Sequence, residues 1–455
     1  MVSGGLRRLG EVYGVARDLP LNYVPRVTID GALREALQRD QHIVIHGSSK
    51  QGKTSLRKYN LDPDDYVVIS CQSKWSLAEL HSAVLKKAGF QVEQSAVRTT
   101  GGGNKVSAKA SAKGGFSLLG NRAEAGVEAG GEVSREHSVQ VESHPLELDP
   151  ADPNDVITAL AAVDFAKFIV LEDFHYLPDE TQAEFAVALK TFHEASGLVF
   201  MIIGVWLDEN RLIQHNGDLA GRVMTINADQ WTASELRQVV HEGERLLNIQ
   251  FSKQFVDDLI DLSFDSVWVI QEVCYLACRA EGIDEEQEDF HPGVASSADV
   301  RDLIDAVVEA QSARYNGFLE HFPDGFQRTE QEMYRWLLLP VLMLPTAQLE
   351  RGVHIDRIKQ IVGSLHPNRV ADMSYLHALR MTPALQVRKG IKPIVIDFDR
   401  TTRKMTIVDR GFLIWLEHQD RLLLLELCGL TEAVDGGKLA GLLAAARTAP
   451  RIGGR

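Results

Sequence analysis

The sequence is poor in cysteine and has no long apolar run. Its 455 residues include four cysteines, at positions 71, 274, 278 and 428, whose spacing matches neither a metal site nor a disulfide framework. We find no signal-peptide pattern and no run of about 18 apolar residues that could cross a membrane. We therefore expect a cytoplasmic protein for which membrane insertion is unfavourable.

Basic residues are fewer than acidic residues. The chain has 48 Lys and Arg against 63 Asp and Glu, which gives a formal net charge of −15. Such a surface favours solubility and argues against a nucleic-acid platform covering the whole protein, although it is compatible with one basic face. The apolar content of 45% is sufficient for the cores of two or three domains of roughly 150 residues each.

One glycine-rich stretch carries the strongest chemical signal. It follows the apolar run 43–45 and reads Gly-Ser-Ser-Lys-Gln-Gly-Lys-Thr. This is the complete G-x-x-x-x-G-K-[ST] pattern, in which backbone N–H groups surround phosphate oxygens at the positive end of a helix. Its lysine supplies charge for the outer phosphates, and its threonine supplies a hydroxyl for Mg²⁺. The predicted nucleotide-binding residues are Gly47, Ser48, Ser49, Lys50, Gln51, Gly52, Lys53, Thr54 and Ser55.

Two carboxylates form the second nucleotide motif. Glu172 and Asp173 directly follow the apolar run 168–171, as expected of a buried parallel strand whose C-terminal end faces the ligand crevice. One carboxylate is expected to hold Mg²⁺ and the other to orient or deprotonate the attacking water. Neighbouring side chains on a strand point in opposite directions, so the roles should differ. By position we assign Glu172 to the metal and Asp173 to the water; the reverse assignment stays open.

Arg222 is a further candidate for the catalytic site. It precedes a short apolar run that ends near Ile226 and is expected to be the last strand of the core. An arginine there could reach a phosphate of its own nucleotide or of a neighbouring subunit's nucleotide. A solvated surface arginine is an equal alternative.

A compositionally biased segment at 97–145 interrupts the core. It is rich in Gly, Ala and Ser, yet lysines at 105, 109 and 113 and glutamates at 124, 128 and 132 share a four-residue spacing. An antiparallel hairpin folded about residues 118–119 would place each lysine opposite a glutamate. We expect a β-hairpin, either as a surface flap or as one part of a collar of several subunits, because isolated hairpins are marginal and their edges seek partners. Membrane insertion fits less well because aromatic girdles are missing.

The region 329–430 combines helical stretches at 329–343, 354–364 and 371–381 with strands at 393–398 and 405–408. Three helices and a hairpin resemble a winged helix. Residues 369–410 hold nine Lys and Arg against four acids, so this region can make phosphate contacts in DNA or RNA. The candidates lie in the turn between the two strands and are Arg400, Arg403 and Lys404. An internal latch or a protein contact is the alternative.

The motifs together resemble the STAND and AAA+ classes of signalling ATPases. The resemblance rests on the phosphate loop, the string Val170-Leu171-Glu172-Asp173-Phe174-His175 and the preceding Val24-Pro25-Arg26. It implies a five-stranded parallel core, a helical lid, Arg26 near the nucleotide, and ATP used as a switch. The sequence departs from these classes at Pro25, at Glu172 and in the lid stretch 264–268. No guanine-reading Asn-Lys-x-Asp motif appears, which favours ATP over GTP.

The resulting division of the chain is an α/β protein in six segments. These are a lead-in at 1–40, a P-loop ATPase core at 41–230 with the insertion at 97–145, a helical lid at 231–281, a linker and connecting helix at 282–328, a winged-helix-like domain at 329–430 and a tail at 431–455.

The first hypothesis is an ATP- and Mg²⁺-dependent molecular switch that hydrolyses ATP and controls homo-oligomerisation or signalling. Class resemblance suggests a bacterial defence or regulatory setting. One alternative is an AAA+ ATPase that binds DNA through the winged helix, similar to replication-initiator or transposition ATPases. Another alternative is a nucleotide-sensing scaffold that does not hydrolyse ATP.

Overall fold

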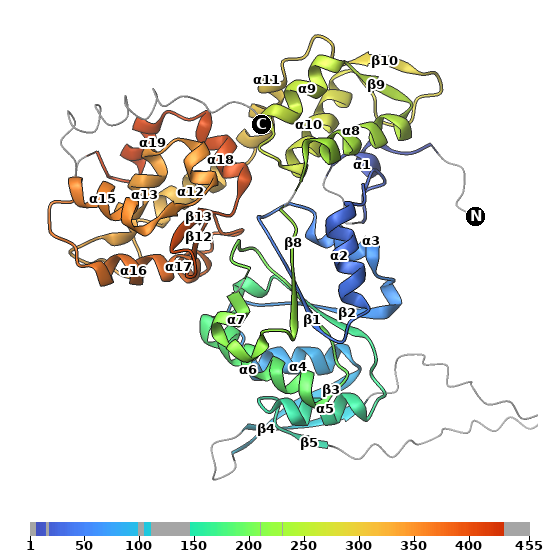
Figure 1. The fold of residues 1–455 in the computed structure, drawn as a ribbon, viewed down its shortest axis with the longest axis vertical. Coiled ribbons are helices and arrows are strands. Elements are labelled where there is room, and N and C mark those ends of the chain that lie inside the picture. The colour runs from blue at the N-terminus through green and yellow to red at the C-terminus, as the bar shows by residue number, and fades with distance from the viewer. Residues whose placement is uncertain are drawn as a thin grey trace, which may run out of the picture.

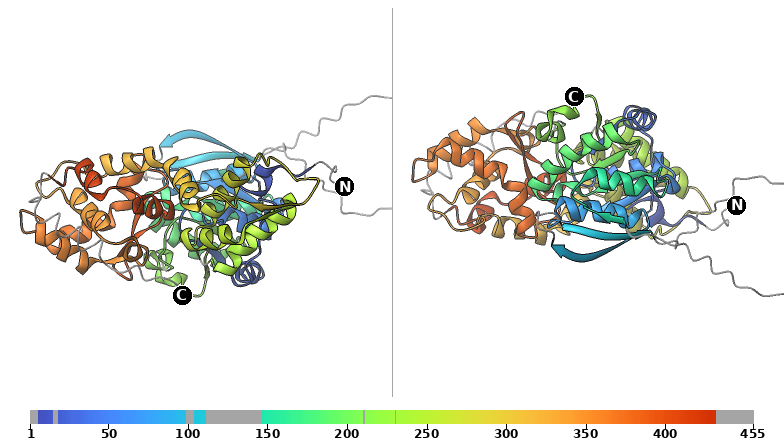
Figure 2. Two further views of the ribbon diagram at one scale, coloured as in Figure 1. Left: turned by 90° about the horizontal axis from the view of Figure 1, so that it is seen from above. Right: turned by 90° about the horizontal axis from the view of Figure 1, so that it is seen from below.

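The computed structural model describes residues 6–14, 18–98, 104–110, 146–209, 211–229 and 231–431. Figure 1 shows three parts: a core coloured blue to green, a lid in yellow-green, and a C-terminal domain in orange to red. Seen from above and below in Figure 2, the C-terminal domain lies to one side of the core and the lid. The phosphate loop lies where the three parts meet.

The core is built on a five-stranded, fully parallel sheet. Short apolar runs such as 43–45 form its strands because a parallel strand is buried on both faces. Its order is β2-β6-β7-β1-β8, so β7 separates the strand before the phosphate loop from the strand that ends in the two carboxylates. This confirms the predicted α/β fold with a five-stranded parallel core of the P-loop NTPase type. The strands are β1 (His42–His46), β2 (Tyr66–Ser70), β6 (Phe168–Glu172), β7 (Phe200–Ile203) and β8 (Val223–Asn227).

Helices cover both faces of this sheet. Alternate residues of β1 point to opposite faces: Ile43 and Ile45 join the apolar cluster under α2 and α3, whereas Val44 joins the cluster under α4, α5 and α6. A capping box between Ser76 and Glu79 starts α4. The helices are α2 (Val27–Leu37), α3 (Lys53–Asn60), α4 (Leu77–Lys87), α5 (Pro153–Ala161), α6 (Asp179–Ala195) and α7 (Arg211–His215).

The insertion forms an antiparallel sheet rather than a simple hairpin. Its strands are β3 (Phe90–Arg98), β4 (Asn104–Ala110) and β5 (Leu146–Leu148), with β4 in the middle. Strand β3 pairs along one edge of β4, and β5 pairs with residues 106–108 along the other, so the predicted pairing with the acidic arm is wrong there. Residues 90–98, which begin before the biased segment, supply the partner strand instead. Lys113 and the glutamates at 124, 128 and 132 lie outside the described residues.

The lid is a helical bundle that also binds the start of the chain. Short α1 (Leu9–Val12) docks on it, and the Tyr13 hydroxyl donates to the Val240 carbonyl (2.5 Å). The predicted lead-in at 1–40 is therefore divided between two parts, because α1 packs on the lid and α2 packs on the core. A strand at His291–Val294 (β10), inside the segment expected as a linker, pairs with β9. The other elements are α8 (Ala233–Leu247), β9 (Ile249–Phe251), α9 (Lys253–Leu262) and α10 (Val267–Ala280).

The C-terminal domain contains helices and a hairpin close to their expected positions. Strands β11 (Val353–His354), β13 (Lys404–Ile407) and β12 (Ile396–Asp399) form a three-stranded antiparallel sheet in that order. One apolar cluster runs from the lid into this domain. The lid continues into α11 (Val300–Glu309), which packs on α9 and α10. The helices of the C-terminal domain are α12 (Ser312–His321), α13 (Met333–Met343), α14 (Thr346–Glu350), α15 (Ile355–Leu365), α16 (Asp372–Arg380), α17 (Thr382–Arg388), α18 (Arg410–Glu417) and α19 (Arg421–Leu427).

No helix among the described residues combines the length and the apolar content that a membrane crossing requires.

Candidate nucleotide-binding site

The phosphate loop connects β1 to α3 through three residues with positive φ. Gly47 (φ 143°), Lys50 (φ 61°) and Gly52 (φ 80°) bend the backbone so that it turns directly into the helix. A side chain at Gly47 is excluded, because a Cβ atom there would lie 2.7 Å from Oδ1 of Asp229. Gly52 is the N-cap of α3, whose first turn contains Lys53, Thr54 and Ser55. The sequence motif therefore forms a loop that presents backbone N–H groups at a helix N-terminus.

Lys53 is folded back onto the loop. Its ammonium donates to the carbonyls of Gly47 (3.0 Å) and Ser48 (2.5 Å). Burial lowers the pKa of Lys53 to about 8, and the nearby Asp229 and Asp173 charges oppose this shift only in part. The lysine is thus held at the loop by neutral carbonyls, which a phosphate group can replace.

Asp229, just after β8, is seated on the loop and was not predicted. Its carboxylate accepts from the Ser48 N–H (2.5 Å) and from the Ser48 hydroxyl (2.6 Å). From the C-terminal domain, an Arg410 nitrogen lies 3.8 Å from Asp229. A lone aspartate after a strand carries no motif, so only the sheet order that places β8 beside β1 reveals this contact.

The two acidic residues have different surroundings. Glu172 accepts from Arg57 on α3 (2.9 Å), and the Arg57 guanidinium also lies 4.6 Å from the Tyr66 ring centroid. Asp173 has a left-handed backbone (φ 58°), and burial, followed by the Glu172 charge, raises its pKa. A carboxyl group with a raised pKa, such as that of Asp173, suits proton transfer. An ion-paired carboxylate, such as that of Glu172, stays ionised and suits the binding of a cation. This difference agrees with the separate roles that we assign, which remain predictions.

The available donors suit Mg²⁺. Magnesium in nucleotide sites usually takes one or two carboxylates, keeps several waters and uses phosphate oxygens. Thr54 is exposed at the start of α3, and the Glu172 carboxylate is partly exposed. Within the described ranges, no group of three or more His, Cys, Asp or Glu side chains could hold a metal by itself. A metal here would therefore depend on the nucleotide for its remaining ligands.

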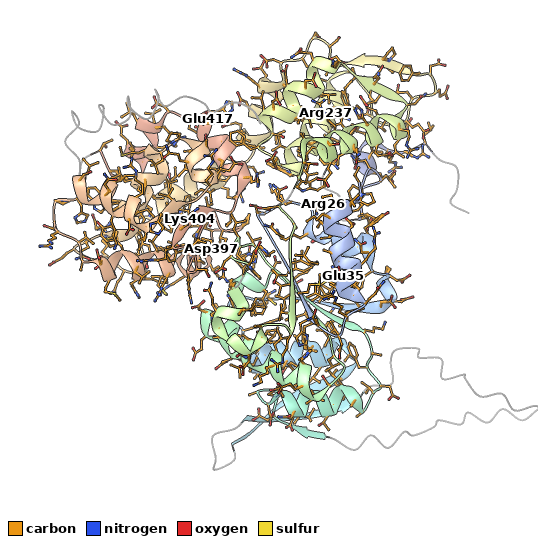
Figure 3. All side chains as sticks on the ribbon, in the orientation of Figure 1. Arg26, Glu35, Arg237, Asp397, Lys404 and Glu417 are labelled. Carbon is orange, nitrogen blue, oxygen red and sulfur yellow. The ribbon has the colours of Figure 1, made fainter. Side chains whose placement is uncertain are left out.

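Arg26 reaches the loop through an aromatic ring. Its guanidinium lies 4.2 Å from the ring centroid of Trp231 and donates to the Ala228 carbonyl (2.7 Å). The Trp231 indole N–H in turn donates to the carbonyl of Gln51 (3.4 Å). Figure 3 shows Arg26 at the end of α2 that faces the lid. Its place beside the loop agrees with the resemblance, while direct contact with nucleotide remains a prediction.

The lid and the C-terminal domain both contact the tip of the loop. The Lys50 ammonium lies 3.6 Å from the Trp268 ring centroid on α10. The Ser49 N–H donates to the carbonyl of Val408 in the C-terminal domain (2.8 Å). The Gln51 side chain is fully buried, and within the described part of the chain its amide finds no hydrogen-bond partner. Two of the loop's N–H groups, those of Ser48 and Ser49, are thus occupied by the chain itself.

Arg222 lies at the opposite end of the parallel strands from the phosphate loop of its own chain. In the parallel register Val223 pairs with His42, whereas Asn227 pairs with His46 at the loop end of β1. Five residues of strand span about 15 Å. Arg222 donates to Glu194 (2.7 Å) at the protein surface. Contact with the nucleotide of its own subunit is therefore not made in this conformation, and contact with a neighbouring subunit's phosphate remains a prediction.

The predicted nucleic-acid residues have three different environments. Arg400 donates to Asp179 of the core (2.8 Å), and the Lys404 ammonium donates to the Arg351 carbonyl (3.3 Å). Arg403 is exposed. The turn between β12 and β13 is therefore docked on the core through Arg400, and only part of the predicted set faces solvent freely.

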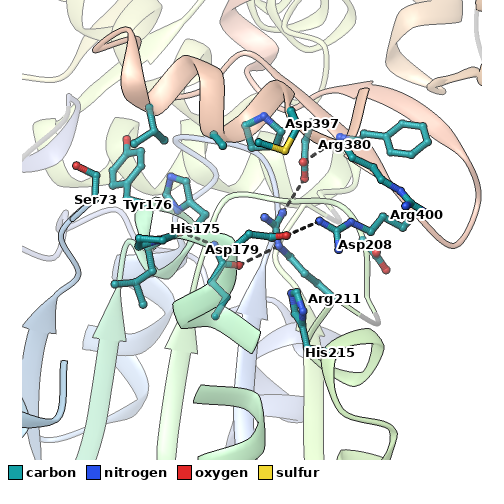
Figure 4. A pocket seen from close by; sticks show the side chains of 18 of the residues that line it. Ser73, His175, Tyr176, Asp179, Asp208, Arg211, His215, Arg380, Asp397 and Arg400 are labelled. Atoms are coloured by element: carbon teal, nitrogen blue, oxygen red, sulfur yellow. Dashed lines mark hydrogen bonds and ion pairs between the residues drawn. The ribbon is translucent and has the colours of Figure 1, made fainter. Parts of the chain in front are cut away.

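Charged pairs fasten the C-terminal domain to the core. In Figure 4, Arg211 extends toward Asp397 and Arg400 toward Asp179; the Arg211–Asp397 distance is 3.0 Å. Burial would raise the pKa of Asp179, but the hydrogen bond and charge of Arg400 outweigh it and hold the pKa below its usual value. Sequence reasoning missed these pairs, because the two segments lie far apart along the chain.

Comparisons with known proteins identify similar folds. No protein-family model matches the sequence, and no curated protein matches it. A Walker-type ATPase of Pyrococcus abyssi is 11% identical over 87% of this chain and 96% of its own, with a TM-score of 0.48. The Aeropyrum pernix ORC1 protein, solved in complex with DNA, is 13% identical over 97% and 100%, with a TM-score of 0.43. A STAND protein of Pyrococcus horikoshii with a tetratricopeptide repeat sensor is 13% identical over 92% and 46%, with a TM-score of 0.34.

Proposed function

We propose that this protein is a Mg-ATP-dependent molecular switch in which the C-terminal domain acts as a latch on the core. The observation that carries the proposal is the hydrogen bond from the Ser49 N–H of the phosphate loop to the carbonyl of Val408 (2.8 Å). It joins the element that would bind phosphate to a domain distant in sequence. A phosphate that takes this N–H must displace the C-terminal domain, so nucleotide and latch compete.

The competition extends to a second contact. The negatively charged Asp229 carboxylate accepts a hydrogen bond from the Ser48 N–H of the loop. A nitrogen of Arg410 in the C-terminal domain lies 3.8 Å from that carboxylate. An incoming phosphate is repelled by this carboxylate and attracted by the arginine. Nucleotide binding is therefore expected to rearrange the segment around 408–410. The released C-terminal domain would then change the oligomeric state, which is the output that we propose.

Turnover would use the residues at the ends of β1 and β6. Mg²⁺, held by Thr54 and Glu172, would neutralise charge on the phosphates when bound. Lys53 would bind the outer phosphates, and Asp173, whose pKa burial raises, would orient the attacking water and accept its proton. Arg57, which pairs with Glu172 (2.9 Å), would fix the direction of that carboxylate.

The test measures ATP affinity in variants of the latch. Asp179 and Arg400 pair at the edge of the interface (2.8 Å). Arg400→Asp should open the latch and raise ATP affinity by up to about fivefold, the range that a partly exposed ion pair allows. The swap Asp179→Arg with Arg400→Asp should restore the wild-type value, and Lys53→Ala should abolish binding. Equal ATP affinity in all latch variants would refute the latch, and retained binding in Lys53→Ala would refute the site.

A further variant decides whether the switch hydrolyses ATP. Asp173→Ala should leave ATP binding intact and reduce turnover by at least about a hundredfold if Asp173 is the general base. Unchanged turnover would favour the nucleotide-sensing scaffold. Light scattering of both proteins with and without ATP measures whether the oligomeric state follows binding or hydrolysis.

Nucleic-acid binding is a second candidate, favoured by exposed basic side chains on the C-terminal domain. Arg380, Arg388 and Arg403 are all exposed, and none has a carboxylate partner among the described residues. Duplex DNA binding should depend on salt, and loss of charge at Arg400, Arg403 and Lys404 should reduce the salt slope. The double variant Arg400→Asp/Arg211→Ala tests whether the core covers part of this basic face. If it does, opening the interface should expose that face, and the double variant should bind DNA more strongly than expected from its loss of positive charge alone. Salt-independent or absent binding would exclude this function.

A further inference from the structure

A cavity lies between the core and the C-terminal domain, beside the charged pairs of the latch. Its volume is about 360 Å³, which is within the range of small-molecule sites, and such sites are common at domain interfaces. Core residues around α6 and α7 line one side, and α16, α17 and β12 line the other. Figure 4 shows these side chains converging from both parts. A molecule in this cavity would contact the two domains at once.

Unpaired cations surround the cavity. Lys74 of the core and Arg380 and Arg388 of the C-terminal domain all contribute to its lining and are exposed. Within the residues that the structure describes, none of the three has a carboxylate partner. The lining has three acids. Asp179 and Asp397 pair with Arg400 and Arg211 respectively, and the buried Asp208 accepts from the Gln214 side-chain amide. The charge left at the cavity is positive, which favours an anion.

A buried histidine provides a donor without a partner. His175 is 3% exposed and lines the cavity. Its Nδ1 accepts from the N–H of Val205 (3.2 Å), so the neutral ring carries its proton on Nε2. Nε2 has no hydrogen-bond partner in the described part of the protein. A buried N–H that lacks a partner costs free energy, which an acceptor on a bound molecule would recover.

Part of the wall is apolar and aromatic. Tyr176 lines the cavity on the core side, with the Lys392 ammonium 4.4 Å from its ring centroid, and Met381 and Val387 line it from the C-terminal domain. These three lining residues are only partly buried, so apolar surface remains accessible inside the cavity. A flat organic body would cover that surface, because stacking and apolar contact tolerate different ring systems.

We propose that this interdomain cavity binds a small organic anion, with its flat apolar body between Tyr176 and Met381 and its acidic group near Arg380 and His175. The ligand bridges the core and the C-terminal domain, so its binding stabilises the closed arrangement by mass action. The binding site itself is independent of the ATP switch. Only this effect on the latch rests on the proposed function.

The test uses 8-anilinonaphthalene-1-sulfonate, a flat apolar anion whose fluorescence rises on binding. With the full chain we expect one saturable site with a Kd of about 10–100 µM, which is ordinary for a ligand of this size. Met381→Trp, which fills the cavity, should weaken binding at least about tenfold. Arg380→Glu should weaken it about threefold to tenfold. Ala384→Phe is a second filling variant in case Met381→Trp does not fold, as judged by circular dichroism.

Two control variants carry matched changes away from the cavity. Arg301→Glu reverses an exposed charge on α11, and Leu423→Ser removes an exposed leucine on α19; both should leave the Kd within about twofold. Absence of saturable binding would overturn the proposal, as would binding lost in Leu423→Ser or unaffected by both Arg380→Glu and the filling variants. If the probe binds as expected but leaves ATP affinity unchanged, the site stands and its link to the latch fails.

Discussion

The C-terminal domain has two contact surfaces of opposite character. Toward the lid it shares one continuous apolar cluster, here called the apolar seam, where α11 and Trp268 of α10 meet α18. Toward the core, the polar seam has three buried apolar residues, Val205, Ile394 and Val408, together with ion pairs and hydrogen bonds. If the two contact surfaces were equally stable, the C-terminal domain would separate from the lid as easily as from the core.

The apolar seam is packed closely around aromatic rings. A Cβ atom at Gly411 would lie 2.6 Å from the Tyr315 hydroxyl and 3.2 Å from the Trp268 ring. Trp415 is fully buried beside Tyr315, with ring centroids 5.1 Å apart. Parting such surfaces exposes apolar area to water at about 25 cal/mol per Å². The lid and the C-terminal domain should therefore move together.

The polar seam carries a smaller cost of opening. Its charged groups regain water when they part, and pairs near the surface contribute about 0.2–1 kcal/mol each. The phosphate loop lies at this seam, so a ligand there acts where resistance is lowest. The switch that we propose should therefore open between the core and the other two parts, rather than between the lid and the C-terminal domain.

The largest expected effect comes from damaging the apolar seam. Trp415→Ala removes a fully buried ring whose N–H donates to the Ser312 hydroxyl (2.6 Å), and should lower the free energy of unfolding by about 3–5 kcal/mol. Urea unfolding should show the lid and the C-terminal domain lost in one transition. Leu423→Ala, at a 62% exposed position, is the control and should change the free energy by less than about 0.5 kcal/mol. Separate transitions for the two parts would contradict a shared core.

Breaking the most buried pair of the polar seam should have the next largest effect. Asp397→Asn leaves Arg211 without its carboxylate at a site where the side chains are only 13% and 4% exposed. The closed arrangement should lose about 2–4 kcal/mol, which fluorescence energy transfer between the core and the C-terminal domain would report as opening. Arg211→Leu combined with Asp397→Leu should close the latch again, since an apolar pair needs no charge partner. Persistent opening in this double variant would argue against the pair as the cause.

The nucleotide pocket beneath the polar seam should respond to pH. The pKa of Lys53 is about 8 in the closed protein, and phosphates bind its protonated form. ATP affinity should therefore be full below this pKa and fall above it, by up to about tenfold per pH unit. Titration calorimetry between about pH 7.5 and pH 9.5 measures the slope, and Lys53→Arg should flatten it because arginine stays protonated. An equal slope in Lys53→Arg would assign the titration to another group.

The smallest expected effect is that of salt. Arg400 and Asp179 are 34% and 51% exposed, so raising the ionic strength from about 0.05 to 0.5 M should weaken their attraction by less than about 1 kcal/mol. Fluorescence energy transfer between the core and the C-terminal domain should report more opening at high salt, and Arg400→Gln should reduce that response. Energy transfer between the lid and the C-terminal domain should not change with salt. Salt sensitivity of equal size at both seams would remove the distinction between them.

The sequence predicted the core well because its signals are local. Apolar runs at 43–45 and 168–171 become the predicted strands, and the glycine spacing at 47–52 becomes a loop at the start of a helix. The helices of the lid and the β12–β13 hairpin also lie close to the predicted positions. Each of these follows from periodicity or turn chemistry within a short window.

The contacts between distant segments could not be predicted in this way. Asp229, Val408 and Arg57 reach the site only through the order of the strands and the docking of a domain. The predicted lysine–glutamate register of the insertion relied on charge spacing and overlooked the strands at 90–98 and 146–148, which pair along the two edges of β4. A charge pair across a ladder contributes only about 0.2–1 kcal/mol, so charge spacing alone does not determine which strand pairs.

The apolar cluster shared by the lid and the C-terminal domain also reaches the phosphate loop. Trp268 lies in that cluster and at the same time carries the Lys50 ammonium of the phosphate loop on its ring. The loop therefore touches the joint core of the lid and the C-terminal domain at one ring, whereas the turn at 400–403 contacts α6 of the core through Arg400. If phosphate moves the loop, as we propose, that movement would reach the lid and the C-terminal domain together through Trp268.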